Sequence, residues 1–123
     1  MQAFGLPKST DAEKAARHAA IQEATRYAIE IPFQVMQTAY ESMEVIKAMA
    51  ETGNPNSVSD AGVGALCARA SVMGAFMNVR INASGYDDKG FVADIIDRGR
   101  KIENNTIALE NDILKVVNEK IGC

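Results

Sequence analysis

An apolar stripe with helical spacing limits most strongly what this chain can fold into. Apolar side chains recur every three or four residues at Ile21, Ala24, Ala28, Ile31, Val35, Ala39, Met43, Ile46 and Ala50. This spacing is typical of one face of a long α-helix. Pro32 lies inside the stripe and lacks a backbone donor, but the stripe stays in phase beyond it. We therefore expect a kink at Pro32 and not a helix end.

Capping signals predict where this helix begins and ends. Thr10 and Glu13 form the Thr-x-x-Glu pattern of a capping box, in which each side chain bonds to the backbone of the other residue. Gly53 follows the last apolar position and is typical of a helix C-terminus. We therefore predict a first helix between the capping box and Gly53.

Two more helices are expected after Gly53. The second opens at Ser59-Asp60, with Ser57 or Ser59 as N-cap, and runs to about Asn82 or Ala83. The third follows a turn with an aspartate cap and runs from about Lys89 to Lys120. Aromatic residues make up only 6% of the chain and Trp is absent, which suits close-packed helices better than sheets. The 123 residues therefore predict one all-α domain, a bundle of three long helices.

Charge and composition argue against several classes of partner. The net charge is −3 and no basic stripe occurs, so a nucleic-acid partner is not expected. No uninterrupted apolar run is long enough to span a membrane, and no apolar signal-peptide region opens the chain. The two cysteines do not form a disulfide framework and fit a reducing compartment. We therefore expect a cytoplasmic protein without membrane association.

The sequence also lacks the motifs of most standard enzyme classes. No phosphate-binding loop, G-x-S-x-G, C-x-x-C or H-E-x-x-H pattern is present. His18 is the single histidine, so we expect no metal site and place it on a helix face. Lys8, in the opening loop, is solvated in the simplest interpretation.

The second predicted helix is apolar nearly all round, which is typical of a helix in the centre of an assembly. Arg69 and Arg80 interrupt it and should reach solvent or a carboxylate partner. Three helices cannot surround one of their own number. Either the chain folds back at Pro32, or a second chain covers the remaining faces, so we expect a dimer or higher oligomer.

One side of this helix carries a stripe of small and polar residues. At 100° per residue, a sector about 80° wide holds seven of them: Asp60, Gly64, Cys67, Ser71, Gly74, Asn78 and Asn82. The stripe is either a close helix contact, in which protein groups satisfy the amides, or the wall of a groove for a polar ligand. Asp60 and Asn78 lie about 27 Å apart along the helix, so they can contact one ligand only if a partner subunit runs antiparallel or if the ligand is long.

Three segments in order resemble a known family. They are LPKSTDAEKAARHAAIQEATRYAIEIPFQV, GNPNSVSDAGVGA and GAFMNVRIN, and together they are similar to the cyclodeaminase/cyclohydrolase family of folate enzymes. The resemblance covers the chain from Phe4 into the third helix. It implies an all-helical fold that forms dimers and a tetrahydrofolate derivative as ligand. It also implies an enzyme that cyclises 5-formiminotetrahydrofolate with release of ammonia, or one that hydrolyses 5,10-methenyltetrahydrofolate.

The resemblance implies roles for particular residues. Both reactions pass through a tetrahedral carbon beside a cationic nitrogen, where a carboxylate stabilises charge and moves protons. Asp60 is the expected catalytic carboxylate, and Lys8 or Arg17 would pair with the anionic tail of folate. The expected substrate-binding residues are Lys8, Arg17, Asn54, Ser59, Asn78 and Asn82.

Family members usually carry a further segment before the position where this chain starts, with a Gly-Gly-Gly-Ser stretch that opens a long helix. The chain is then either a fragment or a short relative that completes its core by association. Besides a folate enzyme, two other hypotheses stay open. One is a non-catalytic folate-binding or oligomerisation module, and the other is a helical adaptor unrelated to folate.

Overall fold

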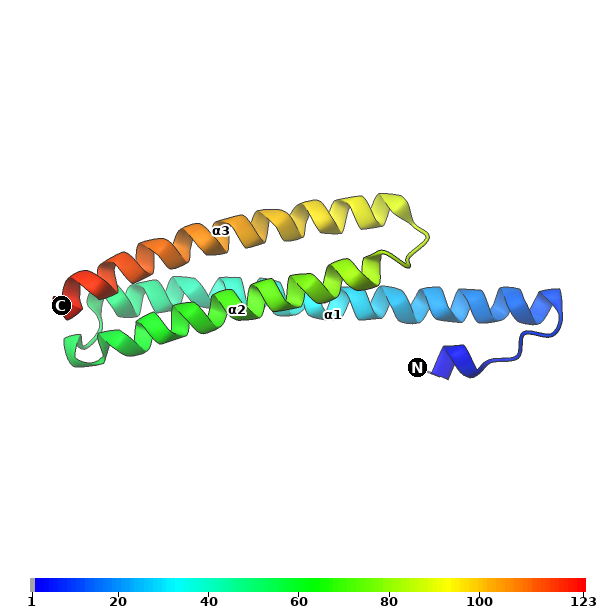
Figure 1. The fold of residues 1–123 in the computed structure, drawn as a ribbon, viewed down its shortest axis with the longest axis horizontal. Helices are drawn as coiled ribbons and strands as arrows, with labels where there is room; N and C mark the ends of the chain where they lie inside the picture. Colours follow the sequence, from blue (N-terminus) through cyan, green and yellow to red (C-terminus); the bar gives the residue numbers. More distant parts are fainter. Residues whose placement is uncertain (1) are drawn as a thin grey trace.

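The computed structural model describes residues 2–123, and within this part of the chain every element is helical. The long helices are α1 (Asp11–Thr52), α2 (Val58–Ala83) and α3 (Lys89–Ile121), and the short 3-10 helices are η1 (Gln2–Gly5) and η2 (Pro55–Ser57). Successive long helices run in opposite directions and are joined by short turns (Figure 1). The prediction of an all-α bundle with three long helices is confirmed.

The predicted capping box begins α1. Glu13 N–H donates to Thr10 Oγ1 at 3.1 Å, and Thr10 N–H donates back to Glu13 Oε2 at 3.1 Å. The helix then runs through Pro32 without interruption. At its end Lys120 of α3 donates to the carbonyl oxygens of Ala50 and Glu51. These carbonyls have no partner inside α1, so a cation at this place stabilises the helix end.

The caps of α2 and α3 are unequal. Ser57 occupies the N-cap position of α2, but its side chain makes no capping bond, and the helix begins at Val58, slightly earlier than expected. The cap of α3 is Asp88, whose Oδ1 accepts from the backbone N–H of Phe91 at 3.0 Å. The predicted aspartate cap is therefore confirmed. The predicted serine stands at the N-cap position, but its side chain does not cap the helix.

The N-terminal part of α1 extends past the turn between α2 and α3 (Figure 1). That turn is fastened to α1 by Gln22, which donates to the Gly85 carbonyl at 3.1 Å and accepts from the Asp87 N–H at 2.8 Å. His18 contacts the Asp87 carboxylate, so the single histidine lies on a helix face, as expected. Side chains of α1 thus hold the turn between α2 and α3 against α1.

Two apolar clusters form the core. The first is centred on Phe76 and contains Ile29, Met36, Val72, Val79 and Ile95, and the second contains Met43, Ala65, Ala68, Ile113 and Val117. In the first cluster the ring of Phe76 lies directly on Gly99, where a Cβ would come within 2.5 Å of the ring. α3 can approach α2 this closely only because position 99 has no side chain.

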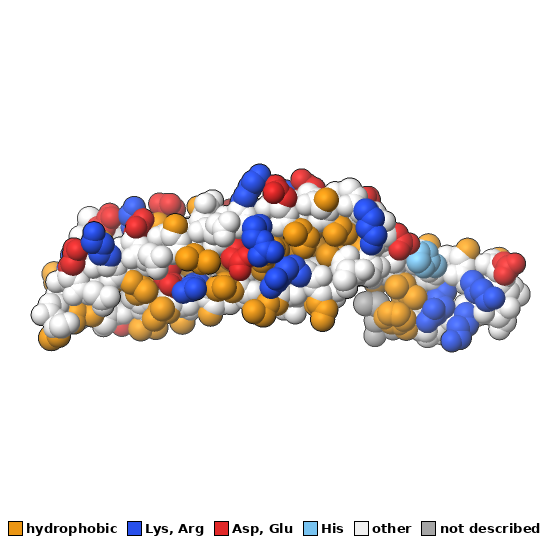
Figure 2. All heavy atoms as spheres, turned by 45° about the horizontal axis from the view of Figure 1, so that its top comes forward, with side chains coloured by type: hydrophobic (Ala, Val, Ile, Leu, Met, Phe, Trp, Pro, Cys, Tyr) orange, Lys and Arg blue, Asp and Glu red, His pale blue; other side chains and the backbone are white. Residues whose placement is uncertain are grey.

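α2 remains partly uncovered in the single chain. Val63 and Leu66 are more than half exposed, as are Met77 and Ile81 farther along the helix. Figure 2 shows apolar side chains gathered in patches on the surface of the bundle. Because α1 is continuous, the chain does not fold back at Pro32 to cover α2. The other explanation for an apolar α2, that a second chain covers it, stays a prediction.

Length and composition alone would allow the segment from Pro55 to Ala83 to cross a membrane. Central helices of soluble proteins pass the same test, and this one packs along both α1 and α3. Its core-facing residues therefore account for much of its apolar character. The absence of membrane association stays a prediction.

Candidate functional site

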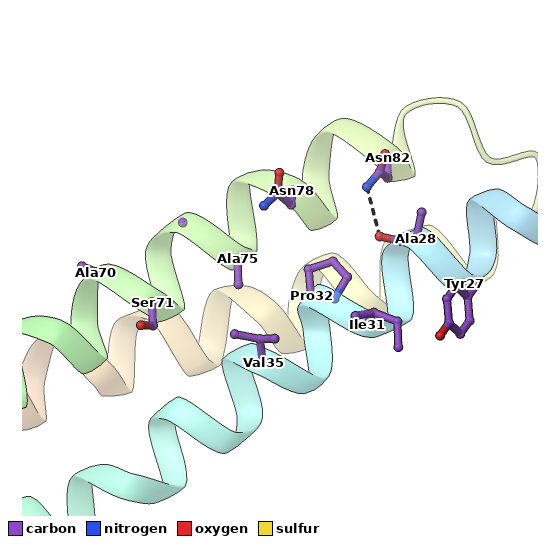
Figure 3. Close-up of a pocket in the computed structure, with 11 residues that line it drawn as sticks. Tyr27, Ala28, Ile31, Pro32, Val35, Ala70, Ser71, Ala75, Asn78 and Asn82 are labelled. Carbon is purple, nitrogen blue, oxygen red and sulfur yellow. Dashed lines mark hydrogen bonds between the residues drawn. The ribbon is translucent and has the colours of Figure 1, made fainter. Parts of the chain in front are cut away.

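An open groove of about 730 Å³ runs between α1 and α2 on the side away from α3. α1 contributes Tyr27, Ala28, Ile31, Pro32 and Val35, and α2 contributes Ala70, Ser71, Gly74, Ala75, Asn78 and Asn82 (Figure 3). This volume lies within the range of small-molecule sites, which combine mainly apolar walls with a few polar groups. All the lining side chains are uncharged, and their principal polar groups are two amides and two hydroxyls.

Asn82 joins the two walls of the groove. Its Nδ2 donates to the Ala28 carbonyl oxygen at 3.0 Å (Figure 3). In a regular helix that carbonyl would accept from the N–H of residue 32, but Pro32 has none. The Asn82 amide therefore satisfies a carbonyl that proline leaves free, and part of its hydrogen-bonding capacity serves the contact between α1 and α2.

Asn78 lies one turn from Asn82 and differs from it. Its side chain is exposed, and within residues 2–123 its amide has no hydrogen-bond partner. A Cβ on nearby Gly74 would meet nothing within 4 Å. The polar stripe of α2 is therefore not a close helix contact here. At Asn82 the contact interpretation is confirmed, and at Gly74 and Asn78 the stripe forms the wall of an open groove.

Asp60 lies at the other end of the same stripe, in the first turn of α2. It is exposed and lines a separate hollow of about 280 Å³ together with Asn54 and apolar residues of α1. Asn54 accepts a bond from the Asn56 N–H at 3.0 Å and thereby caps the short η2 helix. Ser59 is exposed beside Asp60. Within one chain, Asp60 and the amides of Asn78 and Asn82 therefore line different hollows.

The two expected cationic contacts lie near the start of the chain. Arg17 donates through Nε and Nη2 to the Phe4 carbonyl, at 3.4 and 3.3 Å, and its guanidinium stacks on the Phe4 ring. These bonds hold η1 against α1. Lys8 is exposed in the loop between them. This loop leads to the end of α1 that extends past the bundle (Figure 1). Neither residue lines the groove between α1 and α2.

Charged pairs of α1 and α2 lie on the sides of these helices that face α3, where the Arg26 guanidinium is 4.5 Å from the centre of the Phe91 ring. Glu30 accepts a hydrogen bond from Arg26, next to Tyr27, and this bond raises the pKa of the Arg26 guanidinium above its ordinary value. Arg69 finds the carboxylate partner expected for it, since its Nη1 lies 2.8 Å from Glu110 Oε1. Among residues 2–123 no three His, Cys, Asp or Glu side chains gather as metal ligands. That the site works without a metal stays a prediction.

The α1 wall of the groove was missed in the sequence. Tyr27, Ile31 and Val35 are all at least 40% exposed although they are apolar, and Ile31 and Val35 were identified only as positions of the apolar stripe. Pro32 was interpreted only as a kink. The available signal was that a proline inside a helix leaves one carbonyl without a partner, which a polar neighbour must satisfy.

Comparison with known proteins finds relatives that match most of the chain. The family model described as formiminotransferase-cyclodeaminase matches residues 1–101. A methenyltetrahydrofolate cyclohydrolase from Methylorubrum extorquens is 40% identical over 122 residues, which cover 99% of this chain and 59% of that protein. Formimidoyltransferase-cyclodeaminases from Gallus gallus and Mus musculus are 36% and 33% identical, each over 74% of this chain and 17% of their own length.

The chain thus spans about three fifths of the cyclohydrolase and a much smaller part of the two-activity enzymes. Its match to the family model extends from the first residue into α3 and includes both walls of the groove. The three segments that resemble the family also lie within the matched residues. The chain belongs to the formiminotransferase-cyclodeaminase family.

Proposed function

We propose that this chain takes part in folate one-carbon chemistry and binds a tetrahydrofolate derivative in the groove between α1 and α2. The observation that carries the proposal is the groove itself. It is open, uncharged and mainly apolar. Its polar groups include the amide of Asn78, which has no partner among residues 2–123, and the amide of Asn82, whose Nδ2 already donates to Ala28. A flat heteroaromatic ring with several hydrogen-bonding edges suits such a surface. The folate reactions named for the similar proteins support the choice of ligand.

The favoured reaction is hydrolysis of 5,10-methenyltetrahydrofolate, because the similarity to the cyclohydrolase covers nearly the whole chain. Water adds to the methenyl carbon, the bond from that carbon to N5 breaks, and 10-formyltetrahydrofolate and one proton are released. A carboxylate that accepts the proton of the attacking water and holds positive charge nearby would accelerate both steps. Asp60 is the carboxylate proposed for this role. Cyclisation of 5-formiminotetrahydrofolate with release of ammonia is the second candidate, supported by the cyclodeaminase relatives.

A homodimer would complete this site. The exposed apolar residues of α2 lie along the same helix as the polar stripe, and no part of residues 2–123 folds back to cover them. In a two-fold dimer, if residue i of one subunit contacts residue j of the other, then residue j of the first also contacts residue i of the second. If two α2 helices cross antiparallel near Arg69, midway between Asp60 and Asn78, the partner subunit's Asp60 approaches the groove. The proposed site therefore combines the amides of one subunit with the carboxylate of the other.

The loss of methenyltetrahydrofolate absorbance tests the reaction. The unchanged protein is expected to accelerate it above the buffer rate, and Asp60→Asn is expected to lower turnover by about two to four orders of magnitude. Asp112→Asn is the matched control, because Asp112 is an exposed carboxylate of α3 outside both hollows of α2. No acceleration by the unchanged protein, or equal turnover of Asp60→Asn and the control, would contradict the proposal.

Mixing two impaired variants, assayed at a substrate concentration at which each variant alone has little activity, tests the shared site. Asp60→Asn and Asn78→Ala subunits, exchanged to a random mixture, give heterodimers in which one of the two sites keeps both native residues. If the site spans two subunits, about a quarter of the native activity should return. If no activity returns on mixing, although subunit exchange is verified by mass, Asp60 and Asn78 do not act across an interface.

A further inference from the structure

Pro32 changes the hydrogen bonding of the groove wall. In a regular α-helix the N–H of each residue donates to the carbonyl four residues earlier. Proline has no N–H, and its ring crowds that carbonyl, so the Ala28 carbonyl is left without its usual helical partner. The structure shows it accepting from Asn82 Nδ2 of α2 instead, at 3.0 Å (Figure 3).

The free carbonyl determines how the Asn82 amide is turned. Nδ2 is a donor and Oδ1 an acceptor on a group of nearly symmetric shape, so hydrogen bonds alone decide which atom lies where. A flipped amide would place Oδ1 against the Ala28 oxygen, and two acceptors would face each other. With Nδ2 held at Ala28, Oδ1 is the atom left free to accept from a ligand. Asn82 and Ala28 are both half-buried in the wall of the groove, where this orientation matters.

We propose that Pro32 is a positioning residue for the ligand of this groove. It acts through the Ala28 carbonyl to fix the Asn82 amide, so that Oδ1 is presented as a preoriented acceptor. This inference rests on the proposed function and specifies the chemistry that the groove recognises: the N–H donors on the edge of the pterin ring. An alanine at position 32 would restore the helical N–H, which competes for the Ala28 carbonyl. The Asn82 amide would then turn between its two orientations, and only one of them accepts from the ligand.

Pro32→Ala is the variant that tests the inference. It is expected to weaken binding of folic acid by about twofold, because only about half of the Asn82 amides would then present Oδ1 to the ligand. Unfolding in urea should occur at an equal or higher concentration, because alanine is the better residue inside a helix. In an Asn82→Ala background, which itself lowers affinity, the proline replacement should have no further effect on binding. Calorimetric titration of the four proteins gives the comparison.

The control separates positioning from direct contact. Val35 also lines the groove but makes no link to Asn82, so the loss caused by Val35→Ala should be the same with or without Asn82. If Pro32→Ala behaves like this control, or leaves binding unchanged, Pro32 does not act through Asn82 and the inference is wrong.

A measurement without ligand keeps the inference separate from the proposed function. In NMR spectra of the unchanged protein, the side-chain NH₂ protons of Asn82 should exchange slowly with water, and Pro32→Ala should accelerate this exchange. If the unchanged protein does not bind folic acid, the proposed function fails. Equal exchange in both proteins would overturn the link between Pro32 and Asn82, whatever the ligand.

Discussion

Replacing Asn78 with leucine should weaken folate binding by about tenfold or more and leave the stability of the fold nearly unchanged. The Asn78 amide is exposed on the groove wall and has no partner within residues 2–123, so its hydrogen bonds are available to a ligand. Leucine has a similar shape but neither donates nor accepts. Calorimetric titration with folic acid measures the binding, and urea unfolding measures the stability.

Asn118→Leu is the matched control for this prediction. Asn118 is an exposed asparagine of α3 outside the groove. Its replacement removes the same amide from the surface as Asn78→Leu does, and it should leave folic acid binding at the native level. If Asn78→Leu also binds folic acid with native affinity, the groove is not the ligand site. A large loss of stability in Asn78→Leu would mean instead that this amide has a structural partner.

The largest effect on stability is expected from Arg69→Met. Glu110 is only 2% exposed, and its Oε1 is paired with Arg69 Nη1 at 2.8 Å. Its other oxygen and the neighbouring Thr106 hydroxyl are buried without a partner among the described residues. Removing the guanidinium leaves a buried carboxylate uncompensated, which typically costs 3–5 kcal/mol. Arg69 is itself 38% exposed, so we expect the lower end, about 3 kcal/mol, as the fall in the free energy of unfolding.

A double variant shows that the unpaired carboxylate causes this loss. Replacing both members of a buried pair with apolar residues of similar volume is often neutral, so Arg69→Met combined with Glu110→Met should recover most of the stability. If Arg69→Met alone unfolds at the native urea concentration, the ion pair contributes nothing. If the double variant is no more stable than Arg69→Met, lost packing and not lost charge pairing is responsible.

Most of the fold could be predicted because its signals are local. Helix spacing, the Thr10–Glu13 capping box and an aspartate before α3 each depend on residues a few positions apart. The apolar composition of α2 also predicted that a single chain would leave it partly uncovered, and its exposed Val63 and Ile81 agree. The partner that covers them remains a prediction.

The site was harder to predict because it depends on contacts between distant residues. The polar stripe of α2 was visible in the sequence, but only the packing of α1 shows that Asn82 bonds to Ala28 while Asn78 stays free. Arg17 also shows this limit. Its charge suggested a contact with an anionic ligand, yet in the structure it holds Phe4 and with it the start of the chain. Spacing along one helix cannot reveal which polar groups the neighbouring helix already satisfies.

NMR mapping of folic acid on the unchanged protein tests most directly whether the groove is a folate site. Backbone amide signals of a ¹⁵N-labelled sample are followed as ligand is added. Saturable shifts are expected along both walls of the groove, in residues 27–35 of α1 and 70–82 of α2, with the side-chain signals of Asn78 and Asn82 among the most affected. Shifts confined to the outer face of α3, or no saturable shift at any concentration, would contradict a folate site between α1 and α2.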